Sequence, residues 1–201
     1  RLTIPEGWTR WDIAKAMIQV PELHLESEAQ ALELMNNVSL VSDLDPQARN
    51  LEGYLFPDTY EFAPDTTPAE LIEMMVKRFR GVWKPEWTDR ARILNRTTRE
   101  IVTTASIIET EAKLDDERPI VASVIYNRLE KNIPLAVDSS IVYASKLEGK
   151  WRYDGKVYRS DIERRSPYNT RIYAGLPPGP VASPGASSLH AALNPVQSDY
   201  L

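Results

Sequence analysis

Four helix-start signals recur along the chain, and they restrict the fold more than any other feature of the sequence. Each places a hydroxyl residue three positions before an acidic or amide residue: Thr9 and Asp12, Ser27 and Gln30, Thr67 and Glu70, Thr97 and Glu100. The hydroxyl group of such a pair caps N–H groups of a first helical turn, and the second side chain can bond back to the cap. Apolar residues at helical spacing follow every pair, so the sequence predicts helices that begin directly after these positions.

Proline, glycine and polar residues mark the other helix boundaries. They place a helix end at Gly81 and Pro85, a helix after Pro119 capped by Asp115 or Asp116, and helix starts at Ser139 or Ser140 and at Ser187 or Ser188. With the four capped helices, these boundaries predict a chain that is largely helical.

Strand signals are fewer. Residues 2–4 are short and β-prone, and residues 51–62 are aromatic-rich and read as extended. Asp154-Gly155 within residues 153–158 predicts a hairpin, because this dipeptide readily adopts the positive φ angles of a type I′ turn. Residues 166–185 are rich in Pro and Gly but also contain Tyr, Leu and Ile, so an ordered loop is expected there. Helices combined with these strands predict an α+β fold.

The polar stretch 41–50 is expected to be a linker or loop, because the composition becomes aromatic-rich immediately after it. We therefore predict two units, a small N-terminal subdomain over residues 1–48 and a mixed α/β domain over residues 49–201.

Composition excludes several classes of protein. The chain has no cysteine, which excludes disulfides and thiol catalysis and argues against a zinc site. Its two histidines, His24 and His190, stand in no recognisable setting for a Ser-His-Asp apparatus. The net charge of -5 argues against nucleic acid as a partner. No stretch approaches the roughly 18 apolar residues of a membrane span.

One acidic residue of the helix expected at 98–113 falls among apolar residues on a helical wheel. At about 100° per residue, the apolar residues fill one arc, namely Ile101, Val102, Ala105, Ile108 and Ala112. Glu109 lies inside this arc, and Glu111 lies about 60° outside it. A carboxylic acid among apolar neighbours resists ionisation and can deliver its proton, as a glycosidic general acid must. The alternative is a buried structural carboxylate paired with Arg118 or Arg128.

The same helix carries a resemblance to a known family. Ala105-Ser106-Ile107-Ile108-Glu109-Thr110-Glu111-Ala112 is similar to the catalytic helix of the MltG/YceG-like endolytic murein (lytic) transglycosylases. Further matches follow in order: Glu117-Arg118, Val121-Ala122-Ser123-Val124, Asn127-Arg128-Leu129, Leu135 with Asp138, Ile141-Val142-Tyr143, Ser166-Pro167-Tyr168-Asn169-Thr170, Gly175-Leu176-Pro177-Pro178-Gly179-Pro180 and Pro184-Gly185. Ile4-Pro5-Glu6-Gly7 and Leu51-Glu52-Gly53-Tyr54-Leu55-Phe56-Pro57-Asp58-Thr59-Tyr60 match upstream. The sequence departs from the family pattern at Ser139-Ser140, where Pro-Thr is commoner, and at Arg171, where an aromatic residue is usual.

The resemblance implies cleavage of the MurNAc–GlcNAc β-1,4 bond in nascent peptidoglycan strands, which leaves 1,6-anhydro-MurNAc ends and terminates glycan elongation. It implies Glu109 as the catalytic acid, no cofactor and no metal. It also implies a LysM-like subdomain over residues 1–48 ahead of a YceG-like catalytic domain over residues 49–201. Glycan strands are the implied partner, and cell-wall synthases are suggested as others. Family members are single-pass inner-membrane proteins that face the periplasm or exterior, so an anchor before Arg1 and further sequence after Leu201 are expected.

Seven further residues are candidates for the same site. Glu111 and Asp138 could orient substrate or act electrostatically, and Tyr168, Asn169 and Thr170 could hydrogen-bond sugar or N-acetyl groups. Asn127 and Arg128 could position the Glu109 side chain without contacting the substrate themselves. Each has a structural alternative: a cap or loop role for Asp138, a turn after Pro167 for residues 168–170, and a buried polar pair for residues 127 and 128.

Two other functions stay open at this point. A non-catalytic peptidoglycan-binding or scaffolding module would use Glu109 only structurally. A hydrolytic muramidase would need Asp138 or Glu111 as a second carboxylate near Glu109. The mass of the product separates the three functions, because it shows no cleavage, an anhydro end or a reducing end.

Overall fold

Short helices are the main regular elements of the computed structural model, which describes residues 1–201. The helices are α1 (Arg10–Ile18), α2 (Glu28–Leu34), α3 (Pro68–Val82), α4 (Pro85–Ile93), α5 (Thr98–Glu111), α6 (Arg118–Glu130), α7 (Asp138–Leu147), α8 (Arg159–Ile162) and α9 (Ala186–Leu193). The strands are β1 (Leu2–Thr3) and β2 (Thr59–Tyr60), and three 3₁₀ turns span Pro21–Leu23, Val38–Leu40 and Asp115–Glu117. The strands pair antiparallel, with Leu2 opposite Tyr60.

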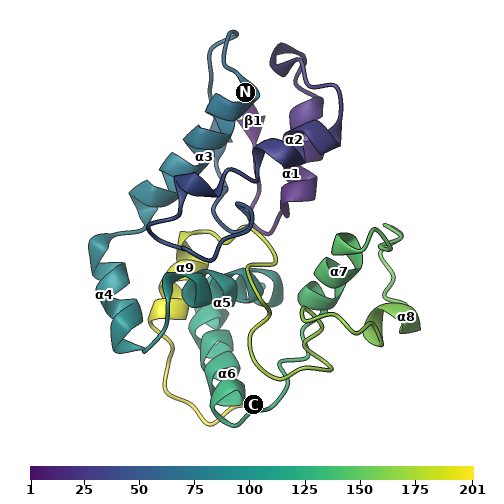
Figure 1. The fold of residues 1–201 in the computed structure, drawn as a ribbon. Helices are drawn as coiled ribbons and strands as arrows, with labels where there is room; N and C mark the ends of the chain where they lie inside the picture. Colours follow the sequence, from purple (N-terminus) through teal and green to yellow (C-terminus); the bar gives the residue numbers. More distant parts are fainter.

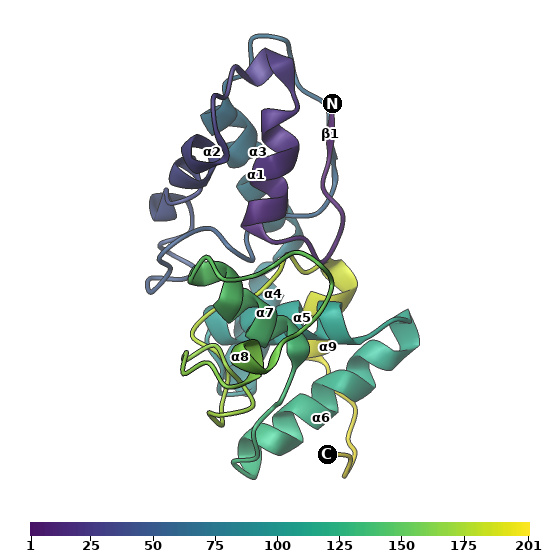
Figure 2. The same cartoon turned by 90° about the vertical axis from the view of Figure 1, so that its right-hand side faces the viewer.

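Two groups of helices lie one above the other in Figure 1. The upper group contains α1, α2 and α3 beside the small sheet, and the lower group contains α4, α5, α6 and α9. Helices α7 and α8 stand to one side of the lower group, and the turned view keeps the two groups apart (Figure 2). Helix α5 is central, because α4, α6, α7 and α9 all pack against it. Because α5 lies at the centre, the residues at its two ends can contact several other helices.

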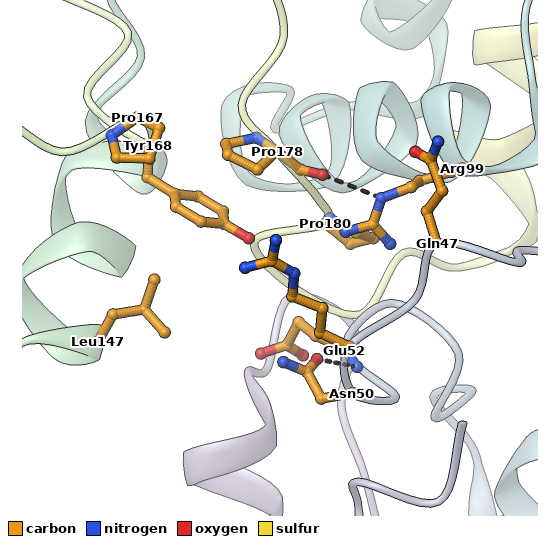
Figure 3. Close-up of a pocket in the computed structure, with 10 residues that line it drawn as sticks. Gln47, Asn50, Glu52, Arg99, Leu147, Pro167, Tyr168, Pro178 and Pro180 are labelled. Carbon is orange, nitrogen blue, oxygen red and sulfur yellow. Dashed lines mark hydrogen bonds between the residues drawn. The ribbon is translucent and has the colours of Figure 1, made fainter. Parts of the chain in front are cut away.

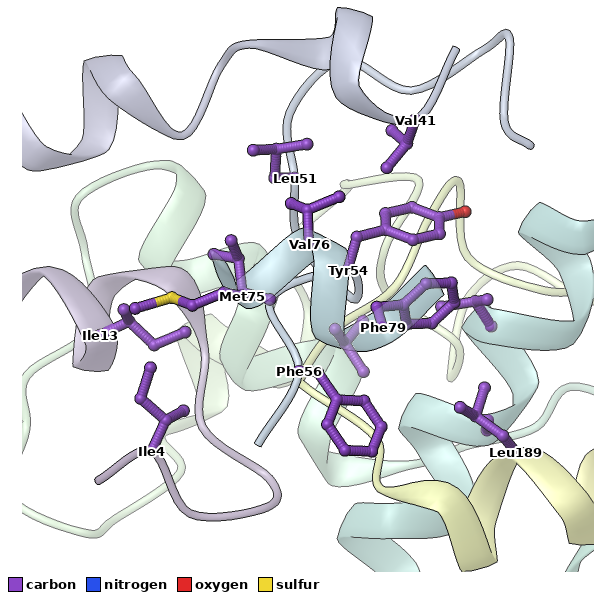
Figure 4. Close-up of a cluster of buried hydrophobic side chains, with 14 of the residues drawn as sticks. Ile4, Ile13, Val41, Leu51, Tyr54, Phe56, Met75, Val76, Phe79 and Leu189 are labelled. Atoms are coloured by element: carbon purple, nitrogen blue, oxygen red, sulfur yellow. The ribbon is translucent and has the colours of Figure 1, made fainter. Parts of the chain in front are cut away.

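The upper group is built from segments on both sides of the polar stretch 41–50. Strand β1 pairs with β2, and α2 packs against α3. Side chains from α1, α3 and the intervening loop meet in one cluster, which includes Ile13, Leu51, Tyr54, Met75 and Phe79 (Figure 4). Elements before residue 48 and elements after it therefore share a sheet and a core. The division into residues 1–48 and 49–201, and the LysM-like character of the first part, stay predictions.

The four predicted helix caps are confirmed. Thr9, Ser27, Thr67 and Thr97 each accept a hydrogen bond from the backbone N–H three residues later. The threonines form complete capping boxes with Asp12, Glu70 and Glu100. The ordered loop expected over residues 166–185 is also present and contains no regular helix or strand.

The β content is smaller than the predicted α+β fold implies. The only sheet has two strands of two residues each, and residues 49–201 contribute just β2. The prediction of a hairpin at residues 153–158 is wrong. Asp154 and Gly155 do form a turn, in which Asp154 Oδ1 accepts from the N–H of Lys156, but no strands flank it. Residues 159–162 form α8 directly afterwards.

Several helix boundaries also differ from the prediction. Pro85 was predicted to end a helix, but it is also the first residue of α4. Its fixed φ angle suits the first turn of a helix. Asp115 and Asp116 lie in a 3₁₀ turn and do not cap α6, which begins at Arg118 with no side-chain cap. Helix α9 begins at Ala186, with Gly185 at the cap position. None of the helices is both long enough and apolar enough to cross a membrane.

Helix α5 is buried on more of its surface than the predicted apolar arc. Thr103, Thr104 and Ser106 are buried together with the apolar residues, because helices pack on several sides of α5. Two of the hydroxyl groups bond within the helix: Thr104 Oγ1 donates to the carbonyl of Glu100 (2.8 Å), and Ser106 Oγ donates to that of Thr103 (2.7 Å).

Candidate active site

Glu109 lies in the last turns of α5, and its side chain is only 6% exposed. Its Oε2 accepts from Nη1 of Arg118 at 3.0 Å, and its Oε1 accepts from the N–H of Gly185 at 2.8 Å and from Oγ of Ser188 at 3.0 Å. The Ser188 hydroxyl in turn accepts from Nη1 of Arg118 at 2.7 Å. Glu109 therefore links α5 to the start of α6 and the start of α9.

The hydrogen-bond partners of Glu109 bear on its expected role as a proton donor. The wheel argument correctly places the side chain in the interior. Every partner of its carboxyl group donates a hydrogen bond, however, and this is the pattern of an ionised carboxylate that accepts only. Arg118, 9% exposed, is a buried cation facing it. The structure thus contains the ion pair with Arg118 that the sequence left open as the alternative, and a catalytic role for Glu109 stays a prediction.

Two further contacts fasten the segment around Gly185. The N–H of Gly7 donates to the carbonyl of Ser183 at 2.9 Å, and the N–H of Ser183 donates to the carbonyl of Trp8 at 2.7 Å. The Glu6 carboxyl group occupies the space that a side chain at position 185 would need, since a Cβ there would lie 2.3 Å from Glu6 Oε1. Burial and the negative charge of Glu109 raise the pKa of Glu6.

Glu111 is the last residue of α5 and lies in a different environment. It forms no hydrogen bond or ion pair, and it lines a cavity of about 350 Å³ whose other walls are mostly apolar side chains: Ile120, Val121, Val124, Ile125, Leu135, Ala136 and Val137. Desolvation by these walls, and secondarily the negative charge of Asp138, raise the pKa of Glu111. A carboxyl group that is accessible from a cavity and retains its proton to higher pH has the properties required of a general acid.

Asp138 is the first residue of α7, close to the end of α5. Its side chain is 70% exposed and lies 3.6 Å from Nη2 of Arg171, a loose ion pair. The two helices are joined beside it, because Thr110 Oγ1 donates to Ser139 Oγ at 2.8 Å. Glu111 and Asp138 are therefore two accessible carboxyl groups on adjoining helix ends. No group of three or more His, Cys, Asp or Glu side chains is placed to hold a metal ion.

Asn169 and Thr170 form hydrogen bonds within the protein. Asn169 is fully buried, and its amide nitrogen donates to the carbonyls of Ile162 and Arg164, both at 2.8 Å. Thr170 is also buried, and its Oγ1 accepts from the N–H of Val137 at 2.9 Å, ahead of α7. These contacts hold both side chains within the protein, Thr170 also through a 2.8 Å hydrogen bond with Ser140 Oγ, and a role in sugar binding stays a prediction.

Asn127 and Arg128 do not support Glu109. The Asn127 amide nitrogen donates to the carbonyls of Ser198 (2.8 Å) and Tyr200 (2.9 Å), and so holds the C-terminal segment against α6. Arg128 donates to the carbonyl of Leu135 at 2.8 Å and lines the Glu111 cavity. The buried cation beside Glu109 is Arg118, which was predicted only as an alternative partner.

Tyr168 belongs to another and larger cavity of about 660 Å³, away from both glutamates. Its ring packs on Tyr143 with 5.0 Å between centroids, and its hydroxyl points into the cavity (Figure 3). The opposite walls carry Gln47, Arg49 and Arg99. No sequence pattern pointed to these three residues, because Gln47 and Arg49 come from one segment and Arg99 from another that only the fold brings beside it. The only available signal was a basic residue in the first turn of the helix after Thr97.

Comparison with known proteins gives consistent matches. The sequence profile of the YceG-like family matches residues 1–201. A protein of Bacillus subtilis (strain 168) named endolytic murein transglycosylase is 41% identical over 152 residues, which is 75% of this chain and 41% of that protein. A protein of Streptococcus pneumoniae serotype 2 (strain D39) with the same name is 33% identical over 217 residues, covering 100% of this chain and 39% of that protein. The chain thus spans about two fifths of the length of these curated relatives.

A solved structure shares the fold. The crystal structure of a YceG-like protein of Listeria monocytogenes superposes with a TM-score of 0.84 at 34% identity, and the match covers 99% of this chain and 68% of that one.

Proposed function

Because the chain belongs to the YceG-like family, we propose that it acts on peptidoglycan as an endolytic lytic transglycosylase. In this proposal the enzyme cleaves the MurNAc–GlcNAc β-1,4 bond within nascent glycan strands, leaves 1,6-anhydro-MurNAc ends and so terminates strand elongation. The names of the curated relatives support the reaction class. The place of action is the bacterial cell envelope, with a single-pass anchor in the inner membrane and the domain facing the periplasm or exterior.

The single observation that carries the mechanism is the contrast between the two glutamates of α5. Glu109 is an acceptor-only carboxylate held by Arg118, Gly185 and Ser188. Glu111 has no partner, faces a cavity and has a raised pKa. We therefore assign the proton donor to Glu111 and a positioning role to Glu109, two residues from the position that the wheel and the resemblance favoured.

The chemistry needs only one titrating group. Protonated Glu111 donates its proton to the glycosidic oxygen as the C1–O bond breaks and an oxocarbenium-like centre develops. The 6-hydroxyl of the same MurNAc then attacks C1, and the Glu111 carboxylate accepts the hydroxyl proton. The leaving GlcNAc has gained one proton, the 1,6-anhydro bond has formed, and Glu111 is protonated again.

A paired assay on purified glycan strands tests this assignment. Glu111→Gln keeps the shape of the side chain but cannot donate a proton as an acid, so cleavage should fall by about 10²–10⁴-fold. Glu130→Gln, a change of an unpartnered exposed carboxylate at the end of α6, is the matched control and should leave cleavage unchanged. Products are identified by mass. If Glu111→Gln remains active while folded Glu109→Gln is inactive, the donor is Glu109 and our assignment is wrong.

The proximity of Asp138 favours one second candidate, a hydrolytic muramidase. The charge of Asp138 acts on Glu111, and a second carboxylate is what activation of water requires. A reducing MurNAc end in place of the anhydro end would establish this alternative. The absence of any cleavage by the native protein would instead favour a non-catalytic peptidoglycan-binding or scaffolding role.

A further inference from the structure

A cavity of about 660 Å³ lies at the other end of α5 from Glu111. The loop at residues 47–52 forms one wall, and the loop at residues 167–180 forms another (Figure 3). Arg99, in the first turn of α5, and Leu147, at the end of α7, complete it. We refer to it as the Arg49 cavity.

The Arg49 cavity contains one cation that no carboxylate offsets. Nη1 of Arg99 pairs with the buried Asp45 Oδ2 at 2.7 Å, and its Nε donates to the carbonyl of Pro178 at 3.0 Å. Glu52, on the opposite wall, accepts from the backbone N–H of Arg10 and faces its guanidinium. Arg49 has no ion pair and no hydrogen bond within the protein. The excess charge of the lining is therefore positive, although the whole chain carries -5.

Two more donors face the same space. Nη2 of Arg99 makes no hydrogen bond, and the hydroxyl of Tyr168 points inward (Figure 3). Burial raises the pKa of Tyr168, although the nearby charges of Arg99, Arg10 and Arg49 act in the opposite direction. The hydroxyl consequently stays protonated and able to donate at neutral pH.

The space between these donors depends on Gly179. A Cβ at this position would lie 2.5 Å from Nη2 of Arg99 and 3.3 Å from the hydroxyl of Tyr168. Its φ angle is not in the left-handed region, so backbone conformation does not demand a glycine here. The missing side chain instead lets the Arg99 guanidinium and the Tyr168 hydroxyl lie close to the backbone of Gly179, so a side chain at this position would displace both donors.

We propose that the Arg49 cavity binds a carboxylate of the peptide stem carried by MurNAc, with Arg49 as its ion-pair partner. The inference rests on the proposed function for the identity of the substrate. A neutral sugar gains little from an unpaired cation, whereas a carboxylate forms charge-assisted hydrogen bonds with guanidinium and hydroxyl donors. Pro178 and Pro180 form the apolar walls on either side of Gly179.

The distance between the two sites suits such a ligand. Twelve residues separate Arg99 from Glu111 along α5, which corresponds to about 18 Å at 1.5 Å per residue. An extended stem peptide of about five residues spans at most roughly 17 Å. The two lengths are similar, so only a fully extended stem on the MurNAc whose bond is cut comes close to the Arg49 cavity.

Calorimetric titration of the native full-length protein with a synthetic stem pentapeptide tests the proposal without any cleavage. Arg49→Gln should weaken binding by about 10-fold to 100-fold, the value of one charge-assisted contact. Arg92→Gln, a change of an exposed arginine on α4 outside the cavity, should leave binding unchanged. Gly179→Ala should weaken binding without any change of charge, and thermal unfolding checks that this variant is folded. A pentapeptide with amidated carboxyl groups should not bind.

A second measurement compares cleavage of peptide-bearing strands with cleavage of strands stripped of peptide by an amidase. Arg49→Gln should raise KM for the peptide-bearing strands and leave the stripped strands unaffected. Equal binding of the pentapeptide by Arg49→Gln and the native protein, or equal binding of the amidated peptide, overturns the proposal even if cleavage is normal. Loss of the proposed function would appear differently, as absent cleavage in the native protein with peptide binding retained.

Discussion

Replacement of Glu109 by glutamine should destabilise the protein, and the contacts of Glu109 show why. Its Oε2 accepts from Arg118, and its Oε1 accepts from the N–H of Gly185 and from Ser188. A glutamine offers one oxygen and one NH₂ group. Whichever way the amide turns, its NH₂ group faces a buried donor.

The size of the loss follows from burial. The two side chains are 6% and 9% exposed, so solvent screens the pair little. Removal of one partner from a buried ion pair costs about 3–5 kcal/mol. Asp115 stays 3.0 Å from Nε of Arg118, but it is 83% exposed and compensates only in part. We expect a loss near the lower end, about 3 kcal/mol, which corresponds to a fall in Tm of roughly 6–12 °C for a chain of this size.

Urea unfolding and thermal unfolding of three variants measure this loss. Glu109→Gln should show the fall, whereas Glu111→Gln, which loses no hydrogen bond, should remain within about 1 kcal/mol of the native protein. The double change Glu109→Gln with Arg118→Met should recover part of the loss, because it removes the uncompensated charge. A Glu109→Gln variant within about 0.5 kcal/mol of the native protein would refute the structural role of Glu109.

Two further changes test the region between the helix groups. Burial raises the pKa of Glu52 from 4.5 to about 7, so its contribution to stability is complete below about pH 4.5 and is lost as the pH rises through about 7. This shift of the Glu52 pKa corresponds to about 3 kcal/mol of stability at 1.36 kcal/mol per pH unit. Glutamine resembles the protonated form of the side chain, so Glu52→Gln should remove this part of the pH dependence. Urea unfolding from pH 4 to 8 measures it. Gly53→Ala should cost about 3 kcal/mol or more, because its φ of +91° disfavours a side chain and a Cβ would lie 2.6 Å from Pro180. Gly81→Ala, with nothing within 4 Å of the new Cβ, is the control, and a Gly53→Ala variant as stable as Gly81→Ala would contradict this explanation.

The elements predicted correctly from the sequence are those whose determinants are local. A capping box is complete within four residues, so Thr9, Thr67 and Thr97 could be identified as helix caps without knowledge of the fold. The hairpin failed for the opposite reason. Asp154-Gly155 specifies a turn, but a hairpin also requires flanking strands that bury a face, and residues 153–158 are mostly exposed.

Only part of the candidate site could be predicted from the sequence, because a local pattern does not identify partners that are distant in the chain. A helical wheel reports which side chains of α5 point inward, and it placed Glu109 correctly in the interior. It carries no information on what meets them there, and Gly185 and Ser188 lie more than 70 residues away. An acid needs desolvation and access to substrate together. The wheel indicates the first property and carries no information on the second, for which the structure shows that Glu111 lines a cavity.

The segments that carried the family resemblance contact one another around α5, so the pattern that identifies the family also corresponds to one connected part of the structure. Gly53 packs on Pro180, Gly7 and Trp8 bond to Ser183, and Glu6 lies against Gly185. These contacts fix the long loop before α9, and that loop supplies Gly185 to Glu109 at one end of α5 and Gly179 to the Arg49 cavity at the other. A single rigid helix then sets the separation of the acid from the proposed peptide site. Changes at the loop contacts should consequently affect both sites at once, whereas Arg49 and Glu111 should each affect one.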